Sequence, residues 1–205
     1  MSFLAYFYDK IMSSAEQACL REWRQDLLKD LHGNVLEIGA GTGANLEFYP
    51  ETIASIVFSE PHKHMRVQLE KNIASSQHSN FSISSGSAEN IDAQDSTYDF
   101  VVSSLVCCSV SSLKSALCEM NRVLKPGGKL VFLEHVAAKK GSKRRRWQNL
   151  ITPLWRRLMG NCHLNRETEK AIIDAGFEME HIKRASMRKV ISIVRPTIRG
   201  IAKKI

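Results

Sequence analysis

The sequence has no long hydrophobic run. None of its apolar stretches approaches the roughly 20 consecutive residues that a membrane-spanning helix needs. The N-terminal segment is apolar and aromatic, with Phe3, Tyr6, Phe7 and Tyr8, but Asp9 interrupts it well short of that length. Because the segment also lacks the form of a signal peptide, we expect a cytoplasmic protein that is at most peripheral to a membrane.

Paired cysteines are missing as well. The five cysteines are an odd number with neither a C-x-x-C pair nor a metal-type spacing: Cys19, Cys107, Cys108, Cys118 and Cys162. This pattern excludes a disulfide framework, is typical of a reduced compartment and gives no indication of a metal site. Repeats, linkers and low-complexity tracts are also absent, and 205 residues with 43% hydrophobic composition suit one α/β domain. We therefore predict a single domain over residues 1–205.

Acidic residues are fewer than basic residues. Lys plus Arg number 29 against 21 Asp plus Glu, and the net charge of +8 weakly favours an anionic partner. Six basic residues lie together before an apolar stripe at 147–159: Lys139, Lys140, Lys143, Arg144, Arg145 and Arg146. They indicate either a solvated loop or a patch for an anionic membrane surface. Nucleic acid is less favoured, because no second basic cluster with interleaved aromatic residues exists. The stripe is interpreted as core or as the wall of a pocket.

What is present is a glycine-rich turn, N-V-L-E-I-G-A-G-T-G, at residues 34–43. A short apolar run precedes Gly39, Gly41 and Gly43. A buried strand that breaks into such a turn and then enters a helix lets the backbone approach a ligand closely, while the helix N-terminus offers free N–H groups. The stretch therefore predicts a site for a nucleotide-containing cofactor.

Strand-like and helix-like segments alternate after this turn. Buried-strand patterns separated by helical stripes occur at 35–38, 55–58, 81–84, 98–106 and 129–134. Connections this short require a parallel, doubly wound α/β sheet. Phe177–Ile182 and Val190–Val194 are predicted to be two final strands that form an antiparallel edge hairpin. The expected fold is thus a mainly parallel, seven-stranded sheet of Rossmann-like type.

Two classes of cofactor remain open on these residues alone. Gly39, Gly41 and Ala44 satisfy a permissive G-x-G-x-x-A pattern, and Glu60 lies 60 − 41 = 19 positions past the second glycine. An acid at that place binds ribose hydroxyls in NAD and in methyl-donor cofactors alike. Glu37, at the strand end, is unfavourable beside a pyrophosphate but favourable beside the sulfonium and ammonium charges of S-adenosylmethionine.

Five motifs then follow in order: E-I-G-A-G-T-G at 37–43, the acid at 60, G-S-A-E at 86–89, Y-D-F-V-V at 98–102 and R-V-L-K-P-G-G-K-L-V-F-L-E-H-V at 122–136. Together they resemble the class I S-adenosylmethionine-dependent methyltransferases. Beyond the core, S-L-V-C-C-S-V at 104–110, C-H-L-N-R-E-T at 162–168 and V-R-P-T-I-R-G-I-A at 194–202 are similar to the methyltransferase-like protein seven group, known as alkyl thiol S-methyltransferases.

The resemblance implies a role for each motif. Glu60 would hold the ribose hydroxyls, Ser87 and Ala88 would lie against adenine, and Leu105 would begin the floor beneath the reactive methyl. Many relatives carry Asp where this chain has Ser87. The residues expected to line the cofactor are Glu37, Gly39, Gly41, Gly43, Glu60, Ser87, Ala88 and Leu105. The implied divisions are an N-terminal helical cap at 1–33, a cofactor-binding core at 34–138, and acceptor-side helices and edge strands at 139–205.

Acceptor chemistry favours a thiol. Deprotonating a thiol of pKa about 8.5 at pH 7 costs about 2 kcal/mol, against about 4.6 kcal/mol for an ammonium of pKa about 10.4. Few bases are available: His135 follows the fifth strand and is the candidate catalytic residue, with His163 second. Cys107 and Cys108 are interpreted as small buried hydrophobes.

The predicted function is therefore transfer of a methyl group from S-adenosylmethionine to a small, fairly apolar acceptor, with a thiol preferred. A quinol, a phenol or a phospholipid amine is the next acceptor. Two alternatives of other classes stay open at this point. They are an NAD-dependent oxidoreductase and a non-catalytic module that docks on membranes or nucleic acid.

Overall fold

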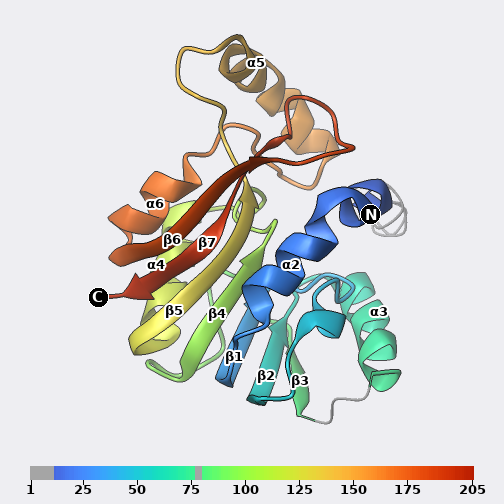
Figure 1. Ribbon diagram of the computed structural model, residues 1–205, viewed down its shortest axis with the longest axis vertical. Coiled ribbons are helices and arrows are strands. Elements are labelled where there is room, and N and C mark those ends of the chain that lie inside the picture. The colour runs from blue at the N-terminus through green and yellow to red at the C-terminus, as the bar shows by residue number, and fades with distance from the viewer. Residues whose placement is uncertain (1–11, 77–79) are drawn as a thin grey trace.

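The computed structural model describes residues 12–76 and 80–205, which contain a seven-stranded sheet with helices on both faces (Figure 1). The strands are β1 Gly33–Ile38, β2 Ile53–Ser59, β3 Phe81–Ser84, β4 Tyr98–Ser104, β5 Leu124–His135, β6 Phe177–Ser186 and β7 Pro196–Lys204. Their order across the sheet is β3-β2-β1-β4-β5-β7-β6. The first five are parallel, and β7 pairs antiparallel with both β5 and β6. The predicted fold class is confirmed.

The strand order reverses at β1, which pairs with β2 on one side and with β4 on the other. Chain connections therefore leave the sheet in opposite directions from β1 and β4, and a crevice forms beyond their carboxyl ends. Glu37 lies in this central strand, in register with Phe58 of β2 and Val102 of β4. The predicted cofactor strand thus occupies the position where open α/β sheets bind ligands.

Two helical layers bury the two faces of the sheet. On one face, α4 (Leu113–Val123) and α6 (Thr168–Asp174) pack against a cluster that includes Leu36, Val101 and Phe132. On the other face, α3 (Lys63–Ala74) and the residues around α2 (Arg21–Leu28) cover Val35, Phe58 and Phe100. Neighbouring residues such as Val35 and Leu36 point to opposite layers, because side chains alternate along a strand.

The N-terminal helical segment lies over the end of β5. It is helical from Met12, passes through a π-helical turn, η1 (Glu16–Leu20), and continues into α2. Leu20 and Trp23 pack there against Leu133 and Met187. The aromatic residues at positions 3–8 that the sequence singles out lie outside the described residues.

The second strand of the edge hairpin is not at Val190–Val194, and that prediction is wrong. Those residues form the connection between β6 and β7, which closes where Ser186 pairs with Pro196. The β-branched residues of the connection suggest a strand, but strand pairing decides the outcome. Residues 197–203 pair with β5 along its length, from His135 opposite Thr197 to Lys129 opposite Lys203.

Helix α5 (Lys143–Leu158) stands beyond the ends of the strands, at the top of Figure 1. Its fully buried side chains are polar, Gln148 and Thr152. Four of its large apolar side chains are exposed, Trp147 57%, Leu150 71%, Leu154 62% and Leu158 60%, while Ile151 and Trp155 are partly buried. These four residues are therefore not in the core, and that part of the interpretation of the stripe is wrong, whereas Trp147 does line an open cavity beside β6 and β7. Across residues 12–76 and 80–205, no helix combines the length and the apolar character that crossing a membrane requires.

Candidate cofactor cleft and active site

The three glycines of the turn serve two different purposes. All have positive φ, +61° at Gly39, +60° at Gly41 and +95° at Gly43. A Cβ on Gly39 would stand 2.7 Å from a methyl of Val106, and one on Gly43 would stand 2.5 Å from Leu46. A Cβ on Gly41 would have no atom within 4 Å. Gly39 and Gly43 therefore permit close packing, whereas the backbone at Gly41 borders open space where a ligand can lie.

Glu60 follows β2 and is bound to the glycine turn. Its side chain is 4% exposed, and one carboxylate oxygen accepts a hydrogen bond of 2.9 Å from the amide of Gly41. The other oxygen accepts one of 2.8 Å from the amide of His62. An ionised carboxylate has further lone pairs on each oxygen. The arrangement therefore presents an acceptor pair beside the open space at Gly41, which fits the two hydroxyls of a ribose.

Glu37 belongs to a buried polar network. Its carboxylate accepts hydrogen bonds from the hydroxyl of Tyr49 at 2.6 Å and from the side-chain amide of Asn45 at 2.9 Å. Asn45 in turn accepts one of 2.7 Å from Arg24, which forms a salt bridge of 2.9 Å with Glu16. Burial raises the pKa of Glu37 from 4.5 to about 7, against the opposing effect of the bonds from Tyr49 and Asn45. No sequence motif indicates these partners of Glu37.

The segment after β3 carries Ser87 and Ala88. Ala88 is buried, and Ser87 is partly exposed and pairs with Asn90 in an isolated bridge. The hydroxyl of Ser59 donates to the carbonyl of Gly86 at 2.8 Å, which holds this segment beside the end of β2. An open cavity of about 900 Å³ is lined by residues 85–87 and 90–94. Ser87 therefore borders a hollow large enough for a nucleobase.

The loop that begins at Leu105 is fixed by Glu134. Leu105 has a φ of +60°, uncommon for a residue with a side chain, and its amide donates to the carbonyl of Leu133 at 2.7 Å. The carboxylate of Glu134 is fully buried and accepts hydrogen bonds from the amides of Val106 and Cys107, both at 3.1 Å. The hydroxyl of Ser103 donates a third, at 2.7 Å. Burial raises the pKa of Glu134.

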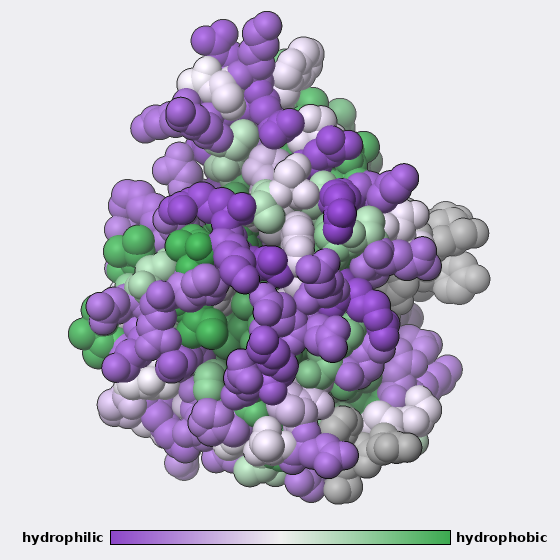
Figure 2. Space-filling model, viewed as in Figure 1, coloured by the Kyte–Doolittle hydropathy of each residue, from purple (hydrophilic) through white to green (hydrophobic). Residues whose placement is uncertain are grey.

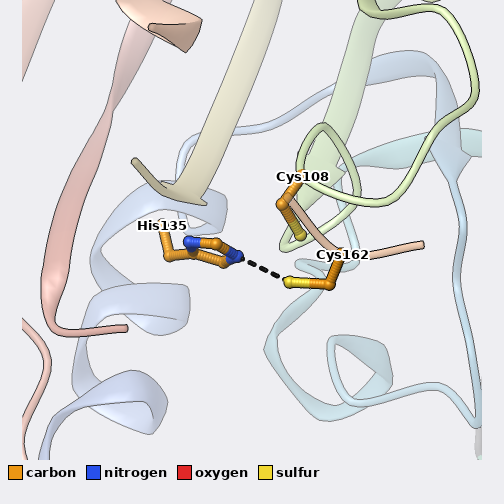
Figure 3. A group of neighbouring side chains, drawn as sticks. All are labelled: Cys108, His135 and Cys162. Atoms are coloured by element: carbon orange, nitrogen blue, oxygen red, sulfur yellow. Dashed lines mark hydrogen bonds between the residues drawn. The ribbon is translucent and has the colours of Figure 1, made fainter. Parts of the chain in front are cut away.

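His135, the last residue of β5, lies beside two cysteines that come from other segments (Figure 3). Its Nε2 is 3.1 Å from the sulfur of Cys162, and the donor atoms of Cys108, His135 and Cys162 all lie within 4.8 Å of one another. The ring is 4% exposed. The neighbouring Cys107 points elsewhere, with its sulfur 3.5 Å from the hydroxyl of Ser103.

Sequence spacing could not indicate this cluster, because 162 − 108 = 54 positions separate its cysteines. Part of the cluster could be inferred from the sequence. Cys108 lies shortly after β4 and His135 ends β5, and the carboxyl ends of these adjacent parallel strands share one edge of the sheet. Cys162 arrives from the segment after α5, which has no regular secondary structure to predict from.

His163, the second candidate base, is held through its backbone. Its amide donates to the carbonyl of Cys108 at 2.7 Å. Burial, and then the charges of Arg166 and Arg156, lower the pKa of its ring to about 4. The imidazole is therefore neutral at physiological pH, and its Nε2 is buried without a hydrogen-bond partner among the described residues.

Comparison with known proteins identifies the family to which this cleft belongs. The family model of the methyltransferase domain matches residues 36–132. Thiol S-methyltransferase TMT1A of Homo sapiens is 37% identical over 175 residues, which cover 83% of this chain and 70% of the human protein. The chain belongs to the class I S-adenosylmethionine-dependent methyltransferases. Its cofactor is S-adenosylmethionine, so the dinucleotide alternative for the glycine turn is set aside.

Two further comparisons, one of sequence and one of structure, were found for this methyltransferase. Thiol S-methyltransferase TMT1B of Rattus norvegicus is 41% identical over 159 residues, which cover 73% of this chain and 64% of the rat protein. An S-adenosylmethionine-dependent methyltransferase structure from Thermotoga maritima superposes with a TM-score of 0.71 at 22% identity, and the match covers 99% of this chain and 96% of that chain. The structural likeness shows the fold alone.

Proposed function

We propose that this methyltransferase acts on the sulfur of a small, fairly apolar thiol. The observation that carries the proposal is the 37% identity to a thiol S-methyltransferase over 83% of the chain. The acceptor end of the cleft supports it. Glu134, the carboxylate next to His135 in the chain, is fully buried and accepts three hydrogen bonds from the protein. A thiol needs the least help from a base, because about 2 kcal/mol deprotonates it at pH 7.

In this proposal the cofactor extends along the carboxyl ends of β3, β2, β1 and β4. When bound, S-adenosylmethionine supplies an electrophilic methyl group on a sulfonium sulfur. Glu60 accepts hydrogen bonds from its ribose hydroxyls, and Gly41 lets its chain lie against the backbone. Ser87 and Ala88 contact adenine. Gly39 and Gly43 shape the cleft beside Glu37, whose carboxylate favours the positively charged end of the cofactor when it is ionised.

The acceptor is proposed to enter between the loop at Leu105 and the end of β5. In-line displacement requires the attacking sulfur to be aligned with the methyl, so positioning supplies much of the rate. His135 is the candidate catalytic residue because its Nε2 faces the sulfur of Cys162 at hydrogen-bonding distance. The buried position of its ring restricts the contact to an acceptor that enters the cleft.

The test is an acceptor panel with purified protein and S-adenosylmethionine. Alkyl thiols, a quinol, a phenol and phosphatidylethanolamine are compared by mass-spectrometric detection of the methylated product. We expect methylation of thiols at a rate at least tenfold above the others. Methylation of the quinol or the amine with unreactive thiols would overturn the proposed acceptor. Binding of NAD in place of S-adenosylhomocysteine would overturn the cleft assignment as well.

We further propose that α5 contacts an anionic membrane surface. Trp147, Leu150, Leu154 and Leu158 recur at helical spacing on one exposed face. Figure 2 shows hydrophilic groups crowded at the tip of the molecule around the start of this helix, with hydrophobic groups along its side. An exposed apolar stripe bordered by basic residues is the composition that lies in a membrane interface.

The basic residues do not all contribute to this surface. Arg145 forms a salt bridge of 2.9 Å with Glu167, and its side chain is 16% exposed. It therefore differs from the exposed cations of the same run, which are Lys139, Lys140, Lys143, Arg144 and Arg146. Each exposed cation near an anionic surface adds about 1 kcal/mol of attraction. The proposed partner is thus a bilayer rich in acidic lipid.

A further inference from the structure

Three separate segments bring soft ligand atoms together at the end of β5. Cys108 comes from the loop after β4, His135 ends β5, and Cys162 lies in the segment after α5 (Figure 3). Cys108 and His135 are buried, and Cys162 is partly buried. The three donor atoms lie within 4.8 Å of one another. Both cysteines are free of disulfides, so each sulfur can serve as a ligand atom beside the imidazole Nε2.

Backbone hydrogen bonds hold these segments in place. The amide of His163 donates to the carbonyl of Cys108 at 2.7 Å, and the amide of Ala137 donates to the carbonyl of Arg166 at 2.9 Å. The guanidinium of Arg166 also donates to the carbonyls of Cys107 and Val110, the latter at 2.6 Å. These hydrogen bonds fix the segments relative to one another, so the backbone itself places the three side chains of the cluster together.

We propose that Cys108, His135 and Cys162 bind one soft divalent cation of the zinc class, with a fourth position open for the thiolate of the acceptor. Two thiolates and one imidazole are the ligands such cations prefer. Sites that act on a substrate have three protein ligands and leave one position free. The cation site stands on the cluster alone, whereas its role toward the acceptor rests on the proposed thiol methylation.

The distances suit tetrahedral coordination after a small adjustment. Metal–sulfur bonds of about 2.3 Å and a metal–nitrogen bond of about 2.05 Å place sulfur and nitrogen about 3.5 Å apart, and two sulfurs about 3.8 Å apart. The observed separation of 3.1 Å between Nε2 and the sulfur of Cys162 must therefore lengthen by a few tenths of an ångström. Both target separations lie within the 4.8 Å that contains the three donor atoms.

The protons balance in each step. Binding of the cation releases the thiol protons of Cys108 and Cys162 to solvent, while the imidazole ligates through Nε2 and keeps its proton on Nδ1. An acceptor thiol that takes the fourth position releases one more proton and ligates as a thiolate. A sulfur lone pair then forms a bond to the methyl carbon as the bond from that carbon to the sulfonium sulfur breaks. The thioether product is a weaker ligand and leaves.

The surroundings of Nδ1 of His135 predict how tightly the site binds a cation. It is buried without a hydrogen-bond partner in residues 12–76 and 80–205, whereas metal-binding histidines usually donate from their second nitrogen. The site therefore lacks the outer contact that strengthens an imidazole ligand. We expect it to bind zinc more weakly than a structural site with four protein ligands.

The experiment uses the full-length protein stripped with a chelator and titrated with Zn²⁺ and with Co²⁺. We expect one ion per chain by elemental analysis, and Co²⁺ absorption bands typical of tetrahedral coordination with sulfur-to-metal charge transfer. Cys108→Ser and Cys162→Ser should each lower the affinity by roughly 100-fold or more. Cys118→Ser, at an exposed position on α4, is the matched control and should bind as the wild type does. Binding of S-adenosylhomocysteine by each variant reports that its fold is intact.

The outcomes separate the cation site from the proposed function. A change in the Co²⁺ spectrum when an alkyl thiol is added supports the open position, and an unchanged spectrum overturns that part. Stripped protein that binds no ion yet methylates thiols at the full rate overturns the cation site and leaves the proposed function standing. If the protein binds one ion per chain but methylates only the quinol, the cation site is supported and the thiol acceptor is overturned.

Discussion

The carboxylate of Glu134 accepts a hydrogen bond from the backbone amide of Cys107 at 3.1 Å, so β5 determines the path of the loop that follows β4. That loop carries Val106, which packs against the glycine turn, and Cys108, which faces His135. A single buried carboxylate therefore sets the position of the loop after β4 relative to the glycine turn.

Glu134→Gln should destabilise the protein by about 1–3 kcal/mol, because a glutamine amide nitrogen cannot accept the hydrogen bond that one carboxylate oxygen now accepts. Unfolding in urea measures the change. Glu178→Gln, at an exposed position on β6, is the control and should have little effect. Equal stability of the two variants would show that the loop does not depend on the carboxylate.

Glu60→Gln should weaken binding of S-adenosylhomocysteine by roughly 10- to 100-fold, because charged hydrogen bonds contribute about 1.5–3 kcal/mol. Some stability should be lost as well, because the amide nitrogen of glutamine cannot accept the hydrogen bond that one oxygen of Glu60 accepts from Gly41 or His62. Calorimetric titration measures the affinity, with Glu51→Gln, an exposed residue in the turn before β2, as the control. Wild-type affinity in the Glu60 variant would mean that the ribose binds elsewhere.

Gly39→Ala should destabilise the fold through contact of its methyl with Val106, which lies 2.7 Å from the position of the new atom. Adding Val106→Ala should restore part of the loss, and the remainder, about 1–2 kcal/mol, measures the strained backbone. Gly41→Ala has almost the same φ and no such neighbour. It should lose cofactor affinity more than stability, and the opposite ranking would contradict the assignment of the two glycines.

Glu37 should make stability depend on pH between about 4.5 and 7. Its pKa is raised in the folded state, so the folded protein binds more protons than the unfolded chain in that interval. Stability should therefore be greatest below pH 4.5 as far as this group is concerned, and should fall as pH rises to 7, by about 3 kcal/mol. Denaturation at a series of pH values should show a flatter profile for Glu37→Gln. Parallel profiles would assign the dependence to other groups.

Leu150→Ser combined with Leu154→Ser should reduce binding to vesicles that contain acidic lipid by about tenfold or more, because each exposed leucine that enters the bilayer contributes about 1.5–3 kcal/mol. Sedimentation with vesicles measures this. Ile173→Ser is the matched control, since Ile173 is 51% exposed on a different helix. Equal binding by both proteins, or no preference for acidic over neutral vesicles, would rule out the membrane surface on α5.

The fold was predictable from local patterns because apolar runs and glycine turns occur at short intervals from Val35 to Glu134. The position of β7 was not, because the β-branched content of Val190–Val194 resembles a strand more strongly than Pro196–Lys204 does. Pairing with β5 decides between them, and pairing partners are not visible in a single sequence. The same limit applies to α5, whose apolar stripe has helical spacing whether it faces the core or solvent.

Parts of the site were predictable for a related reason. The residues that contact the turn directly, such as Glu60, lie at a fixed distance along the chain in a known motif. The partners of Glu37 and the contact between His135 and Cys162 depend on how distant segments fold over one another. Cys162 in particular is brought to the site by hydrogen bonds between backbone groups, which carry no sequence signature.

Helix α5 is attached to the body of the protein largely through its polar side. The side chain of Gln148 accepts from the amide of Ala138 at 2.7 Å and donates to the carbonyl of Ile193 at 2.8 Å. Water can replace such hydrogen bonds at little net cost, whereas it cannot replace buried apolar contacts. Lifting the helix away would therefore expose Gln148, Thr152 and the partly buried Ile151 and Trp155, while its other large apolar side chains are exposed already. Amide hydrogen exchange should accordingly be faster in α5 than in α4, whose buried face is apolar.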